Sequence, residues 1–424
     1  MKKRGTVDKY MLLICILLVL NSKIFYLINI DALPIAFKDI ALIAALFFEC
    51  YVIFKLWRTK VYYRYNMFIL AVIPLAVTSA YMSTKTYGQT FMMGILPQRD
   101  WIVWMFGYFP LIKLLRNQRI TVDRVLAMMY KIAVIYLAIV IVQYLFPQLP
   151  ILHVHSNIRY GEVRLYVGDS PIMLLAGYSL YQFLKKHSVQ HALFFTWCVV
   201  LESVIMKGRA GTISMLVAVL ICLFVEKNSI NKKFLHFLFA LIAGIIFLQT
   251  NMGQNLIATL QGREDLMTGH VRDVGRMLYL ELLSKNWMTS LFGCGYANAN
   301  WGPAVFYIMG SGRYQQEGLS ILTADNGMYG FALYYGLIGI IWAVSMYLYC
   351  FKHAWKIYQN SGNFMFMFFL IWDFVGFQTL YFDCTYALLE FPVFLALLEV
   401  TYDKYVLHEN YKGVFASENR VDYI

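Results

Sequence analysis

Charged residues are scarce in this chain. Only 14% of its 424 residues are Asp, Glu, Lys or Arg, whereas a typical soluble domain carries about a quarter. In their place the sequence has 60% hydrophobic and 17% aromatic residues and a mean hydropathy of +0.58. Apolar runs of about 17 to 25 residues follow one another along the chain, and this is the length that a helix needs to cross a bilayer. The composition excludes a soluble domain of useful size and indicates a polytopic membrane protein.

Several other signals are also missing. The seven cysteines form no CxxC pair and no metal-ligand spacing, so we expect no metal site. The first apolar run, from about Tyr10 to Leu27, is followed by no small-residue cleavage site, so we expect a spanning helix there and not a cleaved signal peptide. The two halves show no convincing similarity of the kind that marks many transporters, which weakly disfavours a transporter.

The formal charge of +12 does not indicate nucleic-acid binding, because the basic residues gather in short clusters between apolar runs and not along one face or arm. Connections poorer in charge alternate with these clusters, which places the clusters in the cytoplasm by the positive-inside rule. The clusters are Lys2–Lys3–Arg4, Lys55/Arg58/Lys60/Arg64, Arg116/Arg119/Arg124, Lys185/Lys186, Lys227/Lys232/Lys233 and Lys352/Lys356. We therefore expect both termini to be cytoplasmic.

The fold class predicted is an all-α polytopic membrane protein with about twelve transmembrane helices. Nine helices are expected in residues 1–249 and three in 325–402, with a cytoplasmic tail over 403–424. External connections are expected near 84–99 and 147–169, and a large external loop over 250–324, before the tenth helix. The expected spans lie near 10–28, 38–56, 66–83, 100–115, 125–146, 170–184, 190–206, 210–226, 233–249, 325–350, 363–381 and 385–402.

Three elements contain residues that could carry chemistry. The first, Lys207-Gly208-Arg209-Ala210-Gly211-Thr212, interrupts two apolar runs. An arginine at membrane depth usually faces a cavity or a partner, which makes Arg209 a candidate functional residue. The alternative is that Lys207 and Arg209 extend to the membrane edge and only mark it. The spacing leaves both interpretations open.

The second element lies in the large loop and runs from Gly269 to Gly295. The stretch from His270 predicts an amphipathic helix on which Arg272 and Arg276 are four residues apart and so share a face. Two guanidinium groups on one face can grip phosphate oxygens, and Asp273 could orient Arg276. The alternative is a solvated helix face with ordinary ion pairs. A glycine turn, Leu291-Phe292-Gly293-Cys294-Gly295, follows Trp287.

The third element, Asp325-Asn326, opens the span that contains Gly336-Leu337-Ile338-Gly339. One interpretation is that Asp325 caps this helix and favours its dipole. The functional interpretation is that Asp325 acts as a general base toward a sugar hydroxyl. In the external connection before the first element, the pair His153 and His155 predicts a metal only weakly, because two ligands without a third are insufficient.

The order of these elements over about residues 150–345 resembles the bacterial O-antigen polymerase and O-antigen ligase family. That family usually has Ser-Arg-Gly where this chain has Gly208-Arg209-Ala210, and His-Asn where it has Asp325-Asn326. The second departure fits a ligase less well than a polymerase.

The resemblance implies inverting transfer of sugar from an undecaprenyl-pyrophosphate-linked oligosaccharide to an acceptor hydroxyl, at the outer face of the plasma membrane. No nucleotide sugar, metal or other cofactor is implied. Apart from the lipid bilayer, a flippase and a chain-length regulator of the same pathway are the partners it suggests. Arg209 and Arg272 would stabilise the leaving pyrophosphate and Asp325 would be the base, with Asp169 and Glu162 as reserves. The substrate-binding residues would be Arg276, His270, Asn326, Arg159, Arg164, Trp287 and Tyr314.

Three alternatives differ in function. One is an O-antigen ligase of the same family, and another is a flippase or exporter in which the arginines bind phosphate without chemistry. A glycosyltransferase that uses polyprenyl-phosphate sugars typically has an acidic pair in its first external loop, where this chain has only Asp31. The last alternative is therefore disfavoured.

Overall fold

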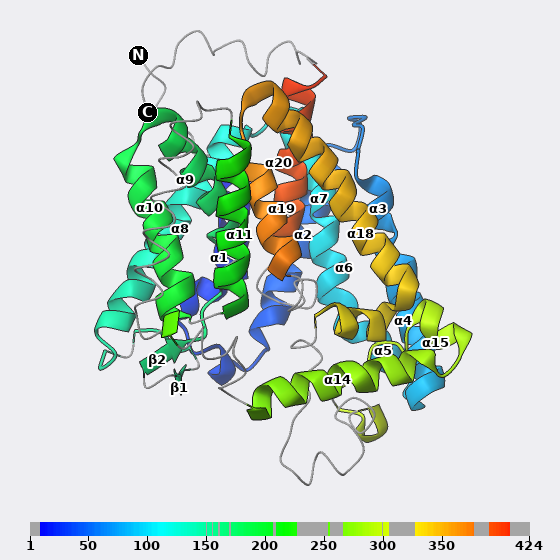
Figure 1. Cartoon of the computed structure of the whole chain (residues 1–424). Coiled ribbons are helices and arrows are strands. Elements are labelled where there is room, and N and C mark those ends of the chain that lie inside the picture. Colours follow the sequence, from blue (N-terminus) through cyan, green and yellow to red (C-terminus); the bar gives the residue numbers. More distant parts are fainter. Residues whose placement is uncertain are drawn as a thin grey trace.

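The computed structural model describes residues 9–149, 151–154, 156–159, 162–168, 171–206, 209–226, 253–254, 266–298, 300–304, 327–376 and 390–407. These residues are mostly helical, which confirms the predicted helical class (Figure 1). The strands among them are β1 (Ser156–Arg159) and β2 (Glu162–Leu165), an antiparallel hairpin in which Ser156 pairs with Leu165.

Most helices form a bundle, and two lie across one end of it. The bundle contains α1 (Lys9–Asn21), α2 (Phe37–Lys55), α3 (Asn66–Leu70), α4 (Val72–Tyr87), α5 (Phe91–Ile95), α6 (Arg99–Phe106), α7 (Tyr108–Arg116), α8 (Val122–Leu145), α9 (Met173–Lys186), α10 (Val189–Val200), α11 (Arg209–Val225), α18 (Met328–Ser361), α19 (Met365–Gly376) and α20 (Glu390–Tyr405). Short 3₁₀ helices cover Lys23–Tyr26, Ile30–Ala32 and Leu96–Gln98, and a π-helix, η4, covers Leu201–Ile205. The two end helices are α14 (Leu266–Ser284) and α15 (Trp287–Phe292). Figure 1 shows α14 crossing the end of the bundle at which the β1–β2 hairpin also lies.

Membrane character is visible in helix length and composition. Within the described residues, three helices are long and apolar enough to cross a membrane: Asn66–Tyr87, Val122–Leu145 and Met328–Ser361. A helix lies in every predicted interval except 233–249, which falls outside the described residues. Several helices expose large apolar side chains, such as Phe54, Met67 and Phe224. Side chains of this kind suit contact with lipid tails.

Some predicted spans differ from the helices observed. The interval 10–28 is too long, because α1 ends at Asn21 and Lys23–Tyr26 have positive φ angles. The run over 66–83 is broken between α3 and α4, where Pro74 has no N–H to offer the carbonyl of Leu70. Pro110 breaks the run over 100–115 between α6 and α7 in the same way.

Helix α20 lies at the centre of the bundle. Every residue from Glu390 to Asp403 is buried, as expected for a helix that is surrounded by other helices. Its last turns carry two carboxylates that meet basic residues of the predicted cytoplasmic clusters. Arg116 lies 2.7 Å from Glu399 and 2.5 Å from Asp403, and Arg64 lies 2.9 Å from Asp403. Two of the cations expected to mark topology thus also balance buried charge.

Candidate functional site

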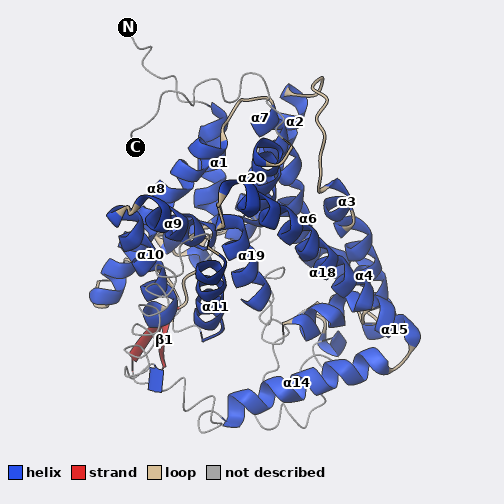
Figure 2. Ribbon diagram, turned by 45° about the horizontal axis from the view of Figure 1, so that its top comes forward, coloured by secondary structure: helices blue, strands red, loops and turns tan. Residues whose placement is uncertain are grey.

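The second sequence element folds into α14, as its pattern predicts. Val274, Tyr279 and Leu282 form its buried face, while Met277 and Leu280 are exposed. With the partly buried Leu278, which lies four residues from both Val274 and Leu282, these apolar side chains form one stripe that packs against the bundle. Figure 2 shows that α14 extends from the side of the hairpin to α15, which lies beside α4. The helix is therefore packed against the end of the bundle and is not surrounded by solvent.

Arg276 is held at the contact between α14 and the first turn of α18. Its Nη1 lies 3.4 Å from an Asp273 oxygen, which agrees with the expectation that Asp273 could orient Arg276. Its Cζ lies 5.7 Å from the centre of the Tyr329 ring, in the geometry of a cation–π contact. The Arg276 side chain is 37% exposed, and among the described residues its buried Nε donates no hydrogen bond. The exposed part of such a guanidinium can bind an anion.

The contact with Tyr329 joins two of the predicted elements. Tyr329 belongs to the first turn of α18, which begins directly after Asp325-Asn326 and Gly327. The second element is thus brought to the start of the helix that the third element opens. Arg272 occupies the α14 position one turn before Arg276. Its side chain, like Asp325 and Asn326 as a whole, lies outside the described residues.

The glycine turn after Trp287 locks this arrangement to α18. The Cys294 N–H donates to the carbonyl oxygen of Leu333 at 2.7 Å. Gly336, with φ 64° and ψ −162°, interrupts the helical backbone of α18 at that point. These angles fall in a region that only glycine enters readily. The turn fits into this interruption, and Gly293 and Gly336 allow the two backbones to approach closely.

Gln89, in the connection over residues 84–99, forms hydrogen bonds with the segment that follows the glycine turn. The Gln89 side-chain N–H₂ donates to the carbonyl oxygen of Tyr296 at 2.8 Å, and the Gln89 side-chain oxygen accepts from the Asn298 N–H at 3.1 Å. The Trp301 indole N–H donates to the carbonyl oxygen of Tyr87 at 2.9 Å. Sequence reasoning missed Gln89, because a single glutamine in a short connection gives no pattern. Its role is to hold two separate connections together.

The first sequence element lies beside the β1–β2 hairpin. Nε of Arg164, on β2, donates to the carbonyl oxygen of Met206 at 2.5 Å, just before Lys207. Arg164 also lies over the ring of Tyr166, with Cζ 4.2 Å from its centre. The backbone of Arg209 begins α11, but its side chain and that of Arg159 are outside the described residues. The structure brings Arg164 to Met206, three residues before Arg209, and no described contact joins Arg164 to Arg276.

Glu202 is a further charged group at the first element. It lies on η4 and is 1% exposed. A Cβ placed on Gly211 would lie 2.4 Å from a Glu202 carboxylate oxygen, so this glycine makes room for that carboxylate. A carboxylate of the chain itself thus fills the space beside the Gly211 backbone. No pattern in the sequence singles out Glu202, and its π-helix, an element frequent at functional sites, leaves no signal in the sequence.

The other predicted residues divide into two groups. Trp287 begins α15 and is 66% exposed, so its ring is free to stack against a ligand. Tyr314, Asp169 and the side chains of His270 and Glu162 lie outside the described residues. His155 does too. Among the residues that the structure describes, no group of three His, Cys, Asp or Glu side chains could hold a metal ion.

Cys294 is buried in the turn as a free thiol, and burial raises its pKa to about 12. It therefore remains protonated near neutral pH and serves as a packing residue.

Comparison with known proteins adds no constraint, because no family model matches the chain and no curated protein matches it.

Proposed function

We propose that this protein polymerises undecaprenyl-pyrophosphate-linked oligosaccharide repeat units into a surface polysaccharide such as O-antigen, capsule or exopolysaccharide. The reaction would take place at the outer face of a bacterial plasma membrane, with both termini in the cytoplasm. The observation that carries the proposal is the contact between Arg276 on α14 and Tyr329 in the first turn of α18. It joins the arginine-bearing helix to the start of the helix that follows Asp325-Asn326.

The arginines suit the leaving group. When the bond from the anomeric carbon to the pyrophosphate breaks, negative charge develops on the leaving oxygen. Guanidinium groups stabilise such charge without a metal. Arg209, Arg272 and Arg276 are the arginines proposed for this role, and Arg164 and Arg159 are proposed to contact the second pyrophosphate or the saccharide.

The acceptor needs a base or an orienting group. Asp325 is proposed to take the proton of the acceptor hydroxyl as its oxygen attacks the anomeric carbon from the side opposite the pyrophosphate. Undecaprenyl pyrophosphate leaves, and the configuration at that carbon inverts. His270, Asn326, Trp287 and Tyr314 are proposed to bind the saccharide. The O-antigen ligase function uses the same chemistry with a different acceptor and remains the nearest alternative.

A flippase or exporter of lipid-linked saccharide is the second candidate, and one observation favours it. Buried carboxylates occur within several predicted spans, namely Glu49, Glu202, Asp373 and Glu390. Ionisable groups in spans often mark transport pathways. The ion-paired end of α20 shows that such groups can also be structural.

The test is a reconstituted reaction. Purified protein in liposomes receives the undecaprenyl-pyrophosphate-linked repeat unit of its own cell, with a chelator present, and the products are separated on a gel. A ladder of products that differ by one repeat unit supports the polymerase. Transfer of the saccharide to a lipid acceptor would indicate a ligase. Movement of the lipid-linked saccharide across the bilayer by folded protein, without any ladder, would instead support the flippase.

A further inference from the structure

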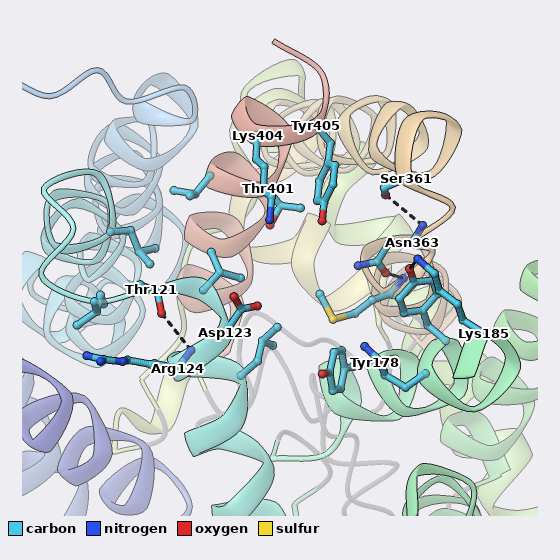
Figure 3. Close-up of a pocket in the computed structure, with 18 of the residues that line it drawn as sticks. Thr121, Asp123, Arg124, Tyr178, Lys185, Ser361, Asn363, Thr401, Lys404 and Tyr405 are labelled. Carbon is cyan, nitrogen blue, oxygen red and sulfur yellow. Dashed lines mark hydrogen bonds between the residues drawn. The ribbon is translucent and has the colours of Figure 1, made fainter. Parts of the chain in front are cut away.

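The proposed function does not use a cavity that lies at the other end of the bundle from α14. It has a volume of about 680 Å³ and lies between the first turn of α8, the end of α9, the start of α19 and the end of α20. In Figure 3, Lys404 and Tyr405 of α20, Asp123 of α8 and Tyr178 of α9 surround this space. Its size is that of a typical small-ligand site.

The lining of the cavity is strongly basic. Arg124, Lys185, Lys186 and Lys404 line it, and Asp123 is the acidic residue among its lining residues. Lys185 and Lys186 lie in the last turn of α9, where the helix dipole favours positive charge. The helix dipole does not explain the position of Arg124. Arg124 lies in the first turn of α8, where the dipole alone disfavours a cation. An anionic ligand in the cavity would explain why cations lie there both at a helix N-terminus and at a helix C-terminus.

Two of the ammonium groups are held by tyrosines at the cavity. Lys185 Nζ donates to the Tyr181 hydroxyl at 2.6 Å. Lys404 Nζ lies 5.0 Å from the centre of the Tyr405 ring. Tyr181 and Tyr405 themselves line the cavity. Cations held in this way lose less conformational entropy when they bind a ligand than freely moving lysines do.

The position of the cavity identifies the kind of ligand. Val122, the first residue of the membrane-length helix α8, lines it, so the cavity lies where that helix would leave the bilayer core. Apolar residues such as Leu126, Met365 and Val400 line it beside the cations. Lysine and tyrosine are typical of the membrane interface, and basic pockets between spanning helices bind anionic lipid headgroups. A phosphate joined to acyl chains matches both parts of the lining.

We propose that this cavity binds the phosphate-bearing headgroup of an anionic phospholipid. The cations would contact the phosphate oxygens, and the apolar wall would contact the beginning of the acyl chains. The site is separate from the proposed polymerase site and does not depend on that function.

The experiment measures the thermal midpoint of the purified full chain in a neutral detergent as phosphatidylglycerol, phosphatidylcholine or inorganic phosphate is added. The cavity variant carries Lys185→Ala, Lys186→Ala and Lys404→Gln together. The matched control carries Lys352→Ala and Lys356→Ala on α18, outside the cavity lining. Arg124→Gln alone is a milder cavity variant that still reports if the triple variant does not fold.

The proposal predicts that phosphatidylglycerol raises the midpoint of the wild type and of the control far more than phosphatidylcholine does. In the folded cavity variants its apparent affinity should fall, by at least about tenfold for the triple variant. Equal effects of both lipids, or an unchanged affinity in the cavity variants, would overturn the proposal. An equally strong response to inorganic phosphate alone would show that the ligand is a soluble anion and would overturn the lipid assignment.

Discussion

Gly293 and Gly336 meet backbone to backbone. A Cβ on Gly336 would lie 2.3 Å from the carbonyl oxygen of Leu291 and 2.4 Å from the Gly293 nitrogen, and a Cβ on Gly293 would lie 2.7 Å from the Gly336 nitrogen. Both glycines have positive φ angles. This contact fastens the turn after α15 to the interruption in α18, and it sets where α14 lies relative to the start of α18.

Replacing either glycine should therefore damage the fold locally. Gly293→Ala and Gly336→Ala each place a methyl group against backbone that cannot easily move. We expect each substitution to lower the free energy of unfolding by about 3 kcal/mol or more. The thermal midpoint of the purified protein in detergent checks this. Gly302→Ala is the control, because no atom lies within 4 Å of its added Cβ. Equal midpoints for all three variants would contradict the close contact.

Arg276 should be needed for activity and not for stability. Its side chain is partly exposed, so Arg276→Ala should change the thermal midpoint little. If Arg276 stabilises the leaving pyrophosphate, the polymerisation rate should fall about a hundredfold or more. Arg276→Lys should restore only part of the rate, because lysine cannot grip two oxygens as a planar fork. A variant with the wild-type rate would remove Arg276 from the site.

Arg116 should behave in the opposite way. Its side chain is 8% exposed and pairs with Glu399 and Asp403, whose side chains are 0% and 1% exposed. Arg116→Ala leaves this buried negative charge only partly compensated. We therefore expect the free energy of unfolding to fall by roughly 3–5 kcal/mol. The exposed Arg119 on the same connection provides the control Arg119→Ala, which should change stability by less than about 0.5 kcal/mol. Both variants are compared by thermal unfolding in detergent.

The Cys294 thiol should resist alkylation. Its pKa is raised to about 12 by burial, so the reactive thiolate is almost absent at pH 8 and becomes appreciable only near pH 12. A variant that keeps Cys294 as its single cysteine should react with a maleimide slowly when folded and rapidly when denatured. A cysteine-free chain with Asn300→Cys, at an exposed position of the same loop, should react rapidly in both states. Rapid labelling of folded Cys294 would contradict its burial.

The sequence predicts the helices better than their interruptions. Runs of apolar residues identify the positions of the helices, since each hydrophobic stretch has to be buried or to face lipid. Pro74 and Pro110 break two of these runs, and the positive φ angles after α1 shorten another. These breaks depend on local hydrogen bonding and on packing, which a count of hydrophobic residues does not contain.

The candidate site was predictable in part. The three-residue spacing indicated that Asp273 could orient Arg276, and the two side chains lie 3.4 Å apart. The predicted partnership of Arg272 with Arg276 concerns a side chain outside the described residues. Gln89 and Glu202 contribute through contacts with segments distant in sequence or through an irregular helix, so no local pattern indicated them. The contact of Arg276 with Tyr329 likewise joins residues that are far apart in the chain.

The most direct test of the central claim is the product that the purified protein makes from an undecaprenyl-pyrophosphate-linked repeat unit in the presence of a chelator. Wild-type protein, Arg209→Ala, Arg272→Ala, Asp325→Asn and the exposed control Arg119→Ala are compared by gel, and the new linkage is examined by NMR. The account predicts a ladder with inverted anomeric configuration from the wild type and the control, lost in the two arginine variants and reduced in Asp325→Asn. Folded wild-type protein that makes no ladder, or arginine variants that make a full one, would contradict it.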